Sequence, residues 1–248
     1  MPESSSNPDA TPATVLGKNG LRRPVWASSE PLMRDYYDTE WGVPVTDEQG
    51  MFERVCLEGF QAGLSWRTVL VKREALRENF LDFNPDVLVE FTESDIERIA
   101  QDPRIIRSRP KIRSVLKNAR ATLTLRERAT ILREKSAQED SSSISPDDAR
   151  LLGFILPNGM RVDDGLPALI WSFRPEITPL PTDFSQIPTQ SEESLALAKR
   201  LKREGFSFVG STTVYAMFEA CGVVDTHLLD SHRRGVSKLW KDDGTRLG

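Results

Sequence analysis

Residues 191–218 constrain the fold of this chain more than any other part of the sequence. Ser191 can cap a helix that continues to about Glu204 with apolar residues at helical spacing. Residues 205–210 then carry a glycine at each end, and glycine permits the backbone conformations of a tight turn. A second apolar helix begins at Ser211. The sequence therefore predicts a helix, a short hairpin and a second helix, although an ordinary turn between two helices would show the same pattern.

Capping signals open helices elsewhere in the chain. Asn84 precedes Pro85, Thr92 lies three residues before Asp95, and Ser65 precedes the apolar residues of a further helix. No segment shows a convincing alternation of apolar and polar residues. We therefore expect an all-α fold.

Composition divides the chain into a folded part and looser segments. Residues 1–20 are rich in Ser, Pro, Asn and Thr and contain few large apolar side chains, which predicts a disordered tail. Residues 135–165 include an acidic, Ser-rich run and are expected to form a surface insertion. Residues 21–134 and 166–236 would together make one folded domain, and residues 237–248 would form a C-terminal tail.

The distribution of charge says more than the net charge of -4. Two groups of basic residues contain no acid, and Lys and Arg clusters of this kind bind phosphates. The members are Arg104, Arg107, Arg109, Lys111, Arg113, Lys117 and Arg120 in the first group, and Lys199, Arg200, Lys202 and Arg203 in the second. Either group alone would suit a solvated helix face, but the two together, one of them leading into the hairpin, favour contact with DNA.

Neither a membrane segment nor a disulfide is expected. No apolar run approaches the roughly 20 residues that span a bilayer, and the first residues lack the basic start and apolar stretch of a secretory signal. Cys56 and Cys221 lie in apolar helical patterns, where a free thiol behaves as a small buried hydrophobic group. We expect a soluble, cytoplasmic, monomeric protein that makes no membrane contact.

The segment from Cys56 to Trp66 carries the clearest functional signal. It places one acid, Glu58, among apolar and small residues and beside an indole, and such an acid can hold a flat, positively charged ligand. Together with Trp41-Gly42-Val43-Pro44 upstream and the hairpin at residues 205–210, this segment resembles the 3-methyladenine DNA glycosylase I family. The resemblance extends over residues 21–134 and 166–232 in the same order.

The resemblance implies an enzyme with the helix-hairpin-helix DNA glycosylase fold, which hydrolyses the N-glycosidic bond of 3-methyladenine in alkylated double-stranded DNA. A damaged base is inaccessible within a duplex, so such an enzyme everts the nucleotide into an aromatic pocket. The positions that match the family's pocket are Trp26, Tyr36, Trp41 and Trp66, of which Tyr36 would either orient Glu58 or stack on the base. Glu58 matches the catalytic acid and would accept a hydrogen bond from the amine of the cationic base. In the alternative, Glu58 pairs with a nearby arginine such as Arg54 and is structural.

Two further sets of residues are implied to contact DNA. Gln61 and Leu64 lie in the bend between two helices, where they would fill the gap left by the everted nucleotide, although Leu64 would equally suit the core. The hairpin would bind the DNA backbone without reading its sequence. Its members here are Gly205, Phe206, Gly210 and Ser211, with Phe206, Phe208 and Val209 as anchors to the core. No activating lysine is evident, so base removal would be hydrolytic and monofunctional.

The chain departs from the family at a zinc site. Many members hold a structural zinc ion, distant from the base, with two Cys and two His. The matching positions are Pro24, Tyr37, His227 and Ser231, so one ligand remains. Because a structural zinc site needs four N or S ligands, we predict no metal and no other cofactor. Apolar and hydrogen-bonded contacts are expected to close the termini instead.

Two other functions fit parts of the sequence. A non-enzymatic binder of damaged DNA would keep the fold and the pocket without turnover, but the presence of Glu58, Tyr36 and Trp66 argues against it. An α-helical interaction protein with no nucleic-acid role is disfavoured by the two basic groups and the glycine-bounded hairpin.

Overall fold

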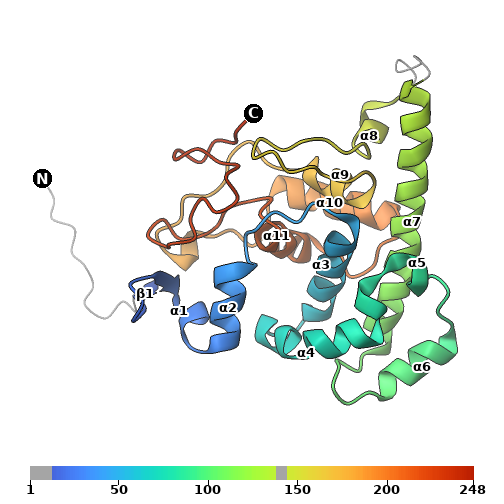
Figure 1. Cartoon of the computed structure of the whole chain (residues 1–248), viewed down its shortest axis with the longest axis horizontal. Helices are drawn as coiled ribbons and strands as arrows, with labels where there is room; N and C mark the ends of the chain where they lie inside the picture. Colours follow the sequence, from blue (N-terminus) through green and yellow to red (C-terminus); the bar gives the residue numbers. More distant parts are fainter. Residues whose placement is uncertain (1–12, 138–143) are drawn as a thin grey trace, which may run out of the picture.

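A computed structural model describes residues 13–137 and 144–248, and most of the secondary structure is helical (Figure 1). The all-α prediction is confirmed. The α-helices are α1 (Val25–Ser28), α2 (Pro31–Thr39), α3 (Glu48–Gln61), α4 (Trp66–Asn79), α5 (Pro85–Leu88), α6 (Glu93–Gln101), α7 (Arg109–Ala137), α8 (Pro146–Ala149), α9 (Leu166–Trp171), α10 (Glu192–Arg203) and α11 (Ser211–Ala220). Two 3-10 turns, η1 (Leu81–Phe83) and η3 (Phe184–Gln186), and two short strands, β1 (Thr14–Leu16) and β2 (Arg22–Pro24), complete the described elements. None of the helices in this described part combines the length and the apolar character that crossing a membrane requires.

The helices begin at the capping residues that the sequence indicates. The Ser65 hydroxyl accepts a hydrogen bond from the Thr68 amide at the start of α4, and Asn84 caps α5 in the same way through the Asp86 amide. Thr92 forms a capping box with Asp95 at the start of α6, and Ser191 forms one with Ser194 at the start of α10. Each cap satisfies amides that have no partner within the helix, which fixes where the helix starts.

Helix α3 lies at the centre of the core. It packs against α4, α7, α9 and α11, and eight of its residues are buried, including Met51, Phe52 and Phe60. Figure 1 shows α7 as the long helix at one side of the molecule, with α5 and α6 against its lower part. Because protein surrounds α3 on several sides, a polar side chain on it meets water only where a cavity opens.

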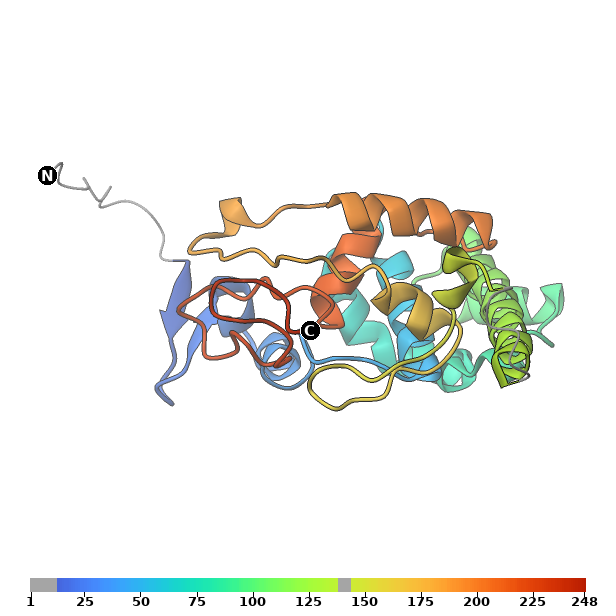
Figure 2. The same ribbon diagram turned by 90° about the horizontal axis from the view of Figure 1, so that it is seen from above.

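The helices α10 and α11 are joined by the short hairpin that the sequence predicts. In Figure 2, α10 runs along the upper edge of the molecule and α11 turns back from it toward the interior. Gly205 has a φ of +98°, a conformation that favours glycine, and ends the first helix. Phe206 and Val209 are buried as predicted anchors, but Phe208 is 36% exposed. Phe208 lies over Gly59 of α3, where an added Cβ would come within 3.3 Å of the Phe208 Cβ.

The predicted N-terminal tail is wrong for the residues that the structure describes. Residues 14–16 form β1, which pairs antiparallel with β2, whereas residues 1–12 lie outside the described part. The Thr14 hydroxyl donates a hydrogen bond of 2.5 Å to Asp230, near the other end of the chain. A contact across so many residues holds a segment whose own composition does not predict order.

Residues 135–165, which are predicted to form a surface insertion, do not all remain at the surface where the structure describes them. Helix α7 continues to Ala137, and residues 138–143 lie outside the described part. From residue 144 the chain returns to the core, because Leu151, Leu156 and Val162 are buried in the main hydrophobic cluster.

The C-terminal residues 237–248 do not form a free tail. Leu239 and Trp240 are buried, and Trp240 and Ile177 pair by isolated bridges with Arg246 and Thr245. The segment has no helical or alternating period, so only its contacts with distant residues order it.

Candidate active site

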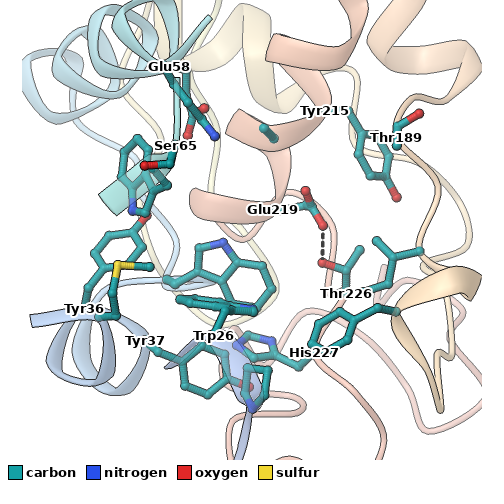
Figure 3. Close-up of a pocket in the computed structure, with 18 of the residues that line it drawn as sticks. Trp26, Tyr36, Tyr37, Glu58, Ser65, Thr189, Tyr215, Glu219, Thr226 and His227 are labelled. Carbon is teal, nitrogen blue, oxygen red and sulfur yellow. Dashed lines mark hydrogen bonds between the residues drawn. The ribbon is translucent and has the colours of Figure 1, made fainter. Parts of the chain in front are cut away.

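A cavity of about 570 Å³ lies between the N-terminal helices α1 and α2, the junction of α3 and α4, and α11 with the segment that follows it (Figure 3). Its volume falls in the range of roughly 300–1,000 Å³ that is usual for small-molecule sites. The lining is largely aromatic and apolar, with two carboxyl groups. Its walls include Trp26, Tyr36, Tyr37, Trp41, Glu58, Gln61, Trp66, Arg67, Tyr215, Glu219, Thr226 and His227.

Glu58 is the acid that α3 presents to this cavity. It is buried, and its Oε2 has no hydrogen-bond partner in the described part of the chain. Burial raises the pKa of the Glu58 carboxyl to about 8, with a further rise from Glu219 and an opposing effect of Arg54. A buried polar oxygen without a partner is costly, so the site suits a ligand that donates a hydrogen bond.

Arg54 does not neutralise Glu58. Its Nη2 donates a hydrogen bond of 2.9 Å to Glu40, which also accepts one of 2.6 Å from Arg73. The Arg54 guanidinium carbon lies 5.8 Å from the centroid of the Tyr36 ring. The structural alternative for Glu58, an ion pair with Arg54, is therefore wrong.

The four predicted aromatic residues all border the same cavity. The rings of Tyr36 and Trp66 are 5.3 Å apart and tilted, and those of Trp26 and Trp41 are 5.8 Å apart and perpendicular. Tyr36 is buried, whereas the three tryptophans are half-buried because the cavity exposes part of each ring. The Trp66 Nε1 is buried and has no hydrogen-bond partner in the described residues. This arrangement offers flat apolar walls beside a carboxyl group.

A second carboxyl, which the sequence reasoning missed, reaches the cavity from α11. Glu219 accepts a hydrogen bond of 2.6 Å from the Thr226 hydroxyl. Burial raises its pKa to about 7, although the Thr226 bond lowers it. The signal was present in the sequence, because the α11 residues that line the cavity, Thr212, Tyr215, Ala216 and Glu219, follow helical spacing.

The bend between α3 and α4 carries the two residues predicted to enter the duplex. Gln61 lines the cavity, and Leu64 is 41% exposed rather than part of the core. Lys111 on α7 holds this bend from behind, since its Nζ donates to the carbonyl oxygens of Phe60 and Ala62 at 2.8 and 2.6 Å. Lys111 therefore faces inward and does not belong to an exposed basic surface.

Several members of the two basic groups pair within the protein. Arg104, Arg109 and Arg113 form ion pairs with acids at or near α6, namely Asp102, Glu97 and Glu93, and Arg104 also reaches Glu78. Arg200 is buried against Asp147 and Glu204. In the described part of the chain the exposed members without an ion pair are Arg107, Lys117, Arg120, Lys199, Lys202 and Arg203. The predicted basic surface is thus smaller than the sequence indicates.

The hairpin contributes backbone more than side chains. The Phe206 ring is buried, which excludes it from direct contact with a ligand at the surface. Asn118 of α7 holds the hairpin at Ser207, accepting from its amide at 2.8 Å and donating to its carbonyl at 3.2 Å. Gly210 is the N-cap of α11, and the Ser211 hydroxyl donates to Gln190 at 2.9 Å.

The four positions that match the family's zinc ligands lie together but do not fit a zinc ion. The Tyr37 and Ser231 hydroxyls are 2.5 Å apart and hydrogen-bonded to each other, and Pro24 has no donor atom. The His227 Nδ1 lies 2.7 Å from Asp225, which leaves one ring nitrogen. Within residues 13–137 and 144–248 no group of three or more His, Cys, Asp or Glu side chains is placed to bind a metal. Pro24, Tyr37 and His227 also contribute to the wall of the cavity.

Comparison with known proteins gives consistent matches. A profile of the family described as methyladenine glycosylase matches residues 26–142 and 159–234. DNA-3-methyladenine glycosylase 1 of Escherichia coli (strain K12) is 40% identical over 212 residues, which covers 84% of this chain and 95% of that protein. A crystal structure of 3-methyladenine DNA glycosylase I superposes with a TM-score of 0.68 at 36% identity, covering 85% of this chain and 98% of the other. A variant of 3-methyladenine DNA glycosylase I in complex with 3-methyladenine has a TM-score of 0.64 at 27% identity, covering 83% and 94%.

Proposed function

The chain belongs to the methyladenine glycosylase family, and we propose that it removes 3-methyladenine from alkylated DNA with Glu58 as the group that recognises the base. The observation that carries the role of Glu58 is its carboxyl oxygen, buried beside aromatic rings in the cavity and without a partner. A 3-methylated adenine nucleotide is positively charged and carries an amino group, so it supplies both the charge and the hydrogen bond that Glu58 lacks.

The cavity favours the charged base through electrostatics. A carboxyl with a pKa of about 8 holds its proton near neutral pH, and the arrival of a cation makes release of that proton favourable because opposite charges attract strongly in a poorly solvated site. Neutral adenine provides no such gain. Discrimination against undamaged DNA therefore follows from charge as well as from shape.

Methylation has already prepared the base to leave. When the bond between C1′ of the sugar and N9 breaks, its electrons pass to the purine and cancel the positive charge. Water then bonds to C1′ and loses a proton. No lysine is among the described residues that line the cavity, which supports hydrolysis by water rather than attack by an amine.

DNA would approach the face where the cavity, the bend and the hairpin meet. Leu64 is exposed in the bend and suits insertion into the base stack, and Gln61, at the end of α3, lines the cavity. The first amides of α11, from Gly210 onward, suit a backbone phosphate. The residues of a single chain line the cavity, so we propose that the protein acts as a monomer on double-stranded DNA. We also propose a cytoplasmic location.

The test is a single-turnover assay on methylated duplex DNA with wild type and Glu58→Gln. Wild type should release 3-methyladenine, and the variant should bind the duplex within about threefold of wild type while its release rate falls by about 100-fold or more. Glu90→Gln, a change at an exposed acid outside the cavity, is the matched control and should behave as wild type. Binding without release by the wild type would favour the non-enzymatic alternative, and full activity in Glu58→Gln would remove Glu58 from this role.

A further inference from the structure

Glu219 gives the cavity a second carboxyl group, on a different helix from the first. Glu58 comes from α3 and Glu219 from α11, and both line the same space (Figure 3). The Thr226 hydroxyl donates a hydrogen bond of 2.6 Å to the Oε1 of Glu219, which fixes the direction of the carboxyl group. Thr226 makes no bond to the Oε2 of Glu219. A hydrogen-bonded and therefore oriented acid at a cavity wall suits recognition better than a freely rotating one.

Arg54 lies close enough to Glu58 to lower the pKa of its carboxyl, but its Nη2 is paired with Glu40. None of the described residues that line the cavity is a cation free to balance the two acids. Among the described lining residues the only arginine is Arg67, whose Nε donates to Glu30 at 2.8 and 3.0 Å and whose side chain is 59% exposed. His227 also lines the cavity, but its Nδ1 lies 2.7 Å from Asp225, so a charge on this ring would be balanced there and not by the two acids. Two acids that share a poorly solvated cavity, and whose neighbouring cations are already paired with other acids, are complementary to a positively charged ligand.

We propose that Glu219, oriented by Thr226, is a specificity-determining residue that acts with Glu58 to select positively charged purines over neutral purines of the same shape. The identity of the purine rests on the proposed function. Glu58 lies beside the aromatic rings and takes the hydrogen bond from the base, whereas Glu219 adds negative charge from the α11 side of the cavity. Thr226 is a positioning residue because it acts only through Glu219.

This division of roles predicts a selective effect. A carboxylate attracts a cation over several ångströms, but it gains little from a neutral ring that does not touch it. Removing the charge of Glu219 should therefore weaken binding of a cation and leave binding of its neutral isostere almost unchanged. A residue that only supported the fold would affect both ligands equally.

The test measures binding of two small purines to the full chain by quenching of tryptophan fluorescence. The cation is 3,9-dimethyladeninium, whose two methylated ring nitrogens carry no proton to lose, and the isostere is 3-deaza-3,9-dimethyladenine. Both are measured at about pH 8.5, where the first is charged and the second is neutral. In Glu219→Gln the dissociation constant of the cation should rise by about tenfold, equivalent to about 1.4 kcal/mol, with less than a twofold change for the isostere. Thr226→Val should give a smaller loss of the same kind, and Thr226→Ser should restore wild-type affinity.

The outcomes separate this inference from the proposed function. Equal losses for both ligands, or no loss for the cation, would overturn the role of Glu219. Base release by wild type from methylated duplex is measured in parallel. If wild type releases 3-methyladenine and Glu219→Gln keeps the full preference for the cation, only the inference fails. If wild type releases no base, the proposed function fails and the identity of the purine fails with it. Glu90→Gln serves as the control variant and should keep both affinities.

Discussion

Replacing Glu58 by Gln should raise the stability of the protein relative to wild type progressively as the pH rises, while it removes most of the activity. Burial, together with the charge of Glu219 and against the effect of Arg54, raises the pKa of Glu58 from its ordinary value of 4.5 to about 8. Between these two values the folded protein holds a proton that the unfolded chain has released. Below about pH 4.5 the ionisation of Glu58 therefore has no effect on the free energy of unfolding of wild type. This free energy then falls as the pH rises from about 4.5 toward about 8.

The size of the effect follows from these two pKa values. One pKa unit corresponds to about 1.36 kcal/mol, so Glu58 costs the folded wild type about 1 kcal/mol at about pH 5 and about 4 kcal/mol at about pH 8. Gln has no such cost. An unpaired buried amide destabilises by about 1–3 kcal/mol, but this amount is the same at both pH values and cancels in the comparison. The stability of Glu58→Gln relative to wild type should therefore increase by roughly 3 kcal/mol over this range.

Urea unfolding followed by tryptophan fluorescence measures this difference directly. Wild type, Glu58→Gln and the control Glu90→Gln should each be unfolded at several pH values between about 5 and 8, the window in which the linkage acts. The first variant should separate progressively from wild type, whereas Glu90→Gln should stay at a constant offset because Glu90 is exposed. If the curves of wild type and Glu58→Gln ran parallel across the range, the carboxyl would not be buried and uncompensated, and the basis for its role in recognising a cation would be lost.

Three further changes test other parts of the site. Lys111→Met removes the ammonium that holds the bend between α3 and α4. Base release from duplex DNA should fall by about tenfold or more, while the affinity for 3,9-dimethyladeninium should stay within about twofold of wild type. An equal loss in both assays would mean that the substitution disrupts the whole site and not only the bend. Leu64→Ala should slow base release more for a normally paired lesion than for a lesion opposite an abasic site, by a factor of more than about three. The lesion opposite an abasic site has less base pairing and stacking to break before eversion, so it depends less on Leu64. Equal slowing on both substrates would exclude a role of Leu64 in eversion. Tyr37→Phe should lower the free energy of unfolding by about 1 kcal/mol in urea titrations, since it removes the bond to Ser231. Elemental analysis of wild type should find less than about half an equivalent of zinc, and a higher content would contradict the metal-free closure.

Local signals predicted the helices well because caps and helical periods act within a few residues. Ser65, Thr92 and Ser191 each satisfy amides of the next turn, so their effect can be recognised without knowing the rest of the fold. The wrong predictions concern segments held by distant contacts. Strand β1 is ordered through β2 and through the hydrogen bond from Thr14 to Asp230, and Trp240 is buried in a segment with no regular period. Composition alone gives no access to such contacts.

The same distinction explains the basic groups. Residues 104–120 contain no acid, and for that reason they were expected to present a basic surface. The acids that neutralise several of them stand just before this window, at Glu93, Glu97 and Asp102, and α6 packs against α7 so that they meet. The charges along a sequence therefore describe a protein surface only when it is also known which helices pack against each other.

The cavity residues were easier to predict than the residues that complete the cavity. Glu58 and the four aromatic residues occur in short motifs near one another in the sequence, and they border one cavity in the fold. Glu219 and Thr226 come from the far end of the chain and meet this cavity only because α11 packs against α3. The helical spacing of the α11 residues was visible, but nothing in the sequence indicates which face of α11 meets α3.

Tyr37 contacts both the C-terminal part of the chain, through Ser231, and the aromatic wall of the cavity. Its hydroxyl bonds to Ser231, while its ring lies 5.6 Å from Trp41 in a stacked arrangement and 5.3 Å from Trp26 at a right angle. The next residue after Trp41 has no room for a side chain, since a Cβ on Gly42 would come within 2.3 Å of the His227 ring. We therefore expect a change at the contact between Tyr37 and Ser231 to alter the position of the aromatic rings that line the cavity. Stability and purine affinity should change together in variants of Tyr37, and a variant that alters only one of them would show that the two regions are independent.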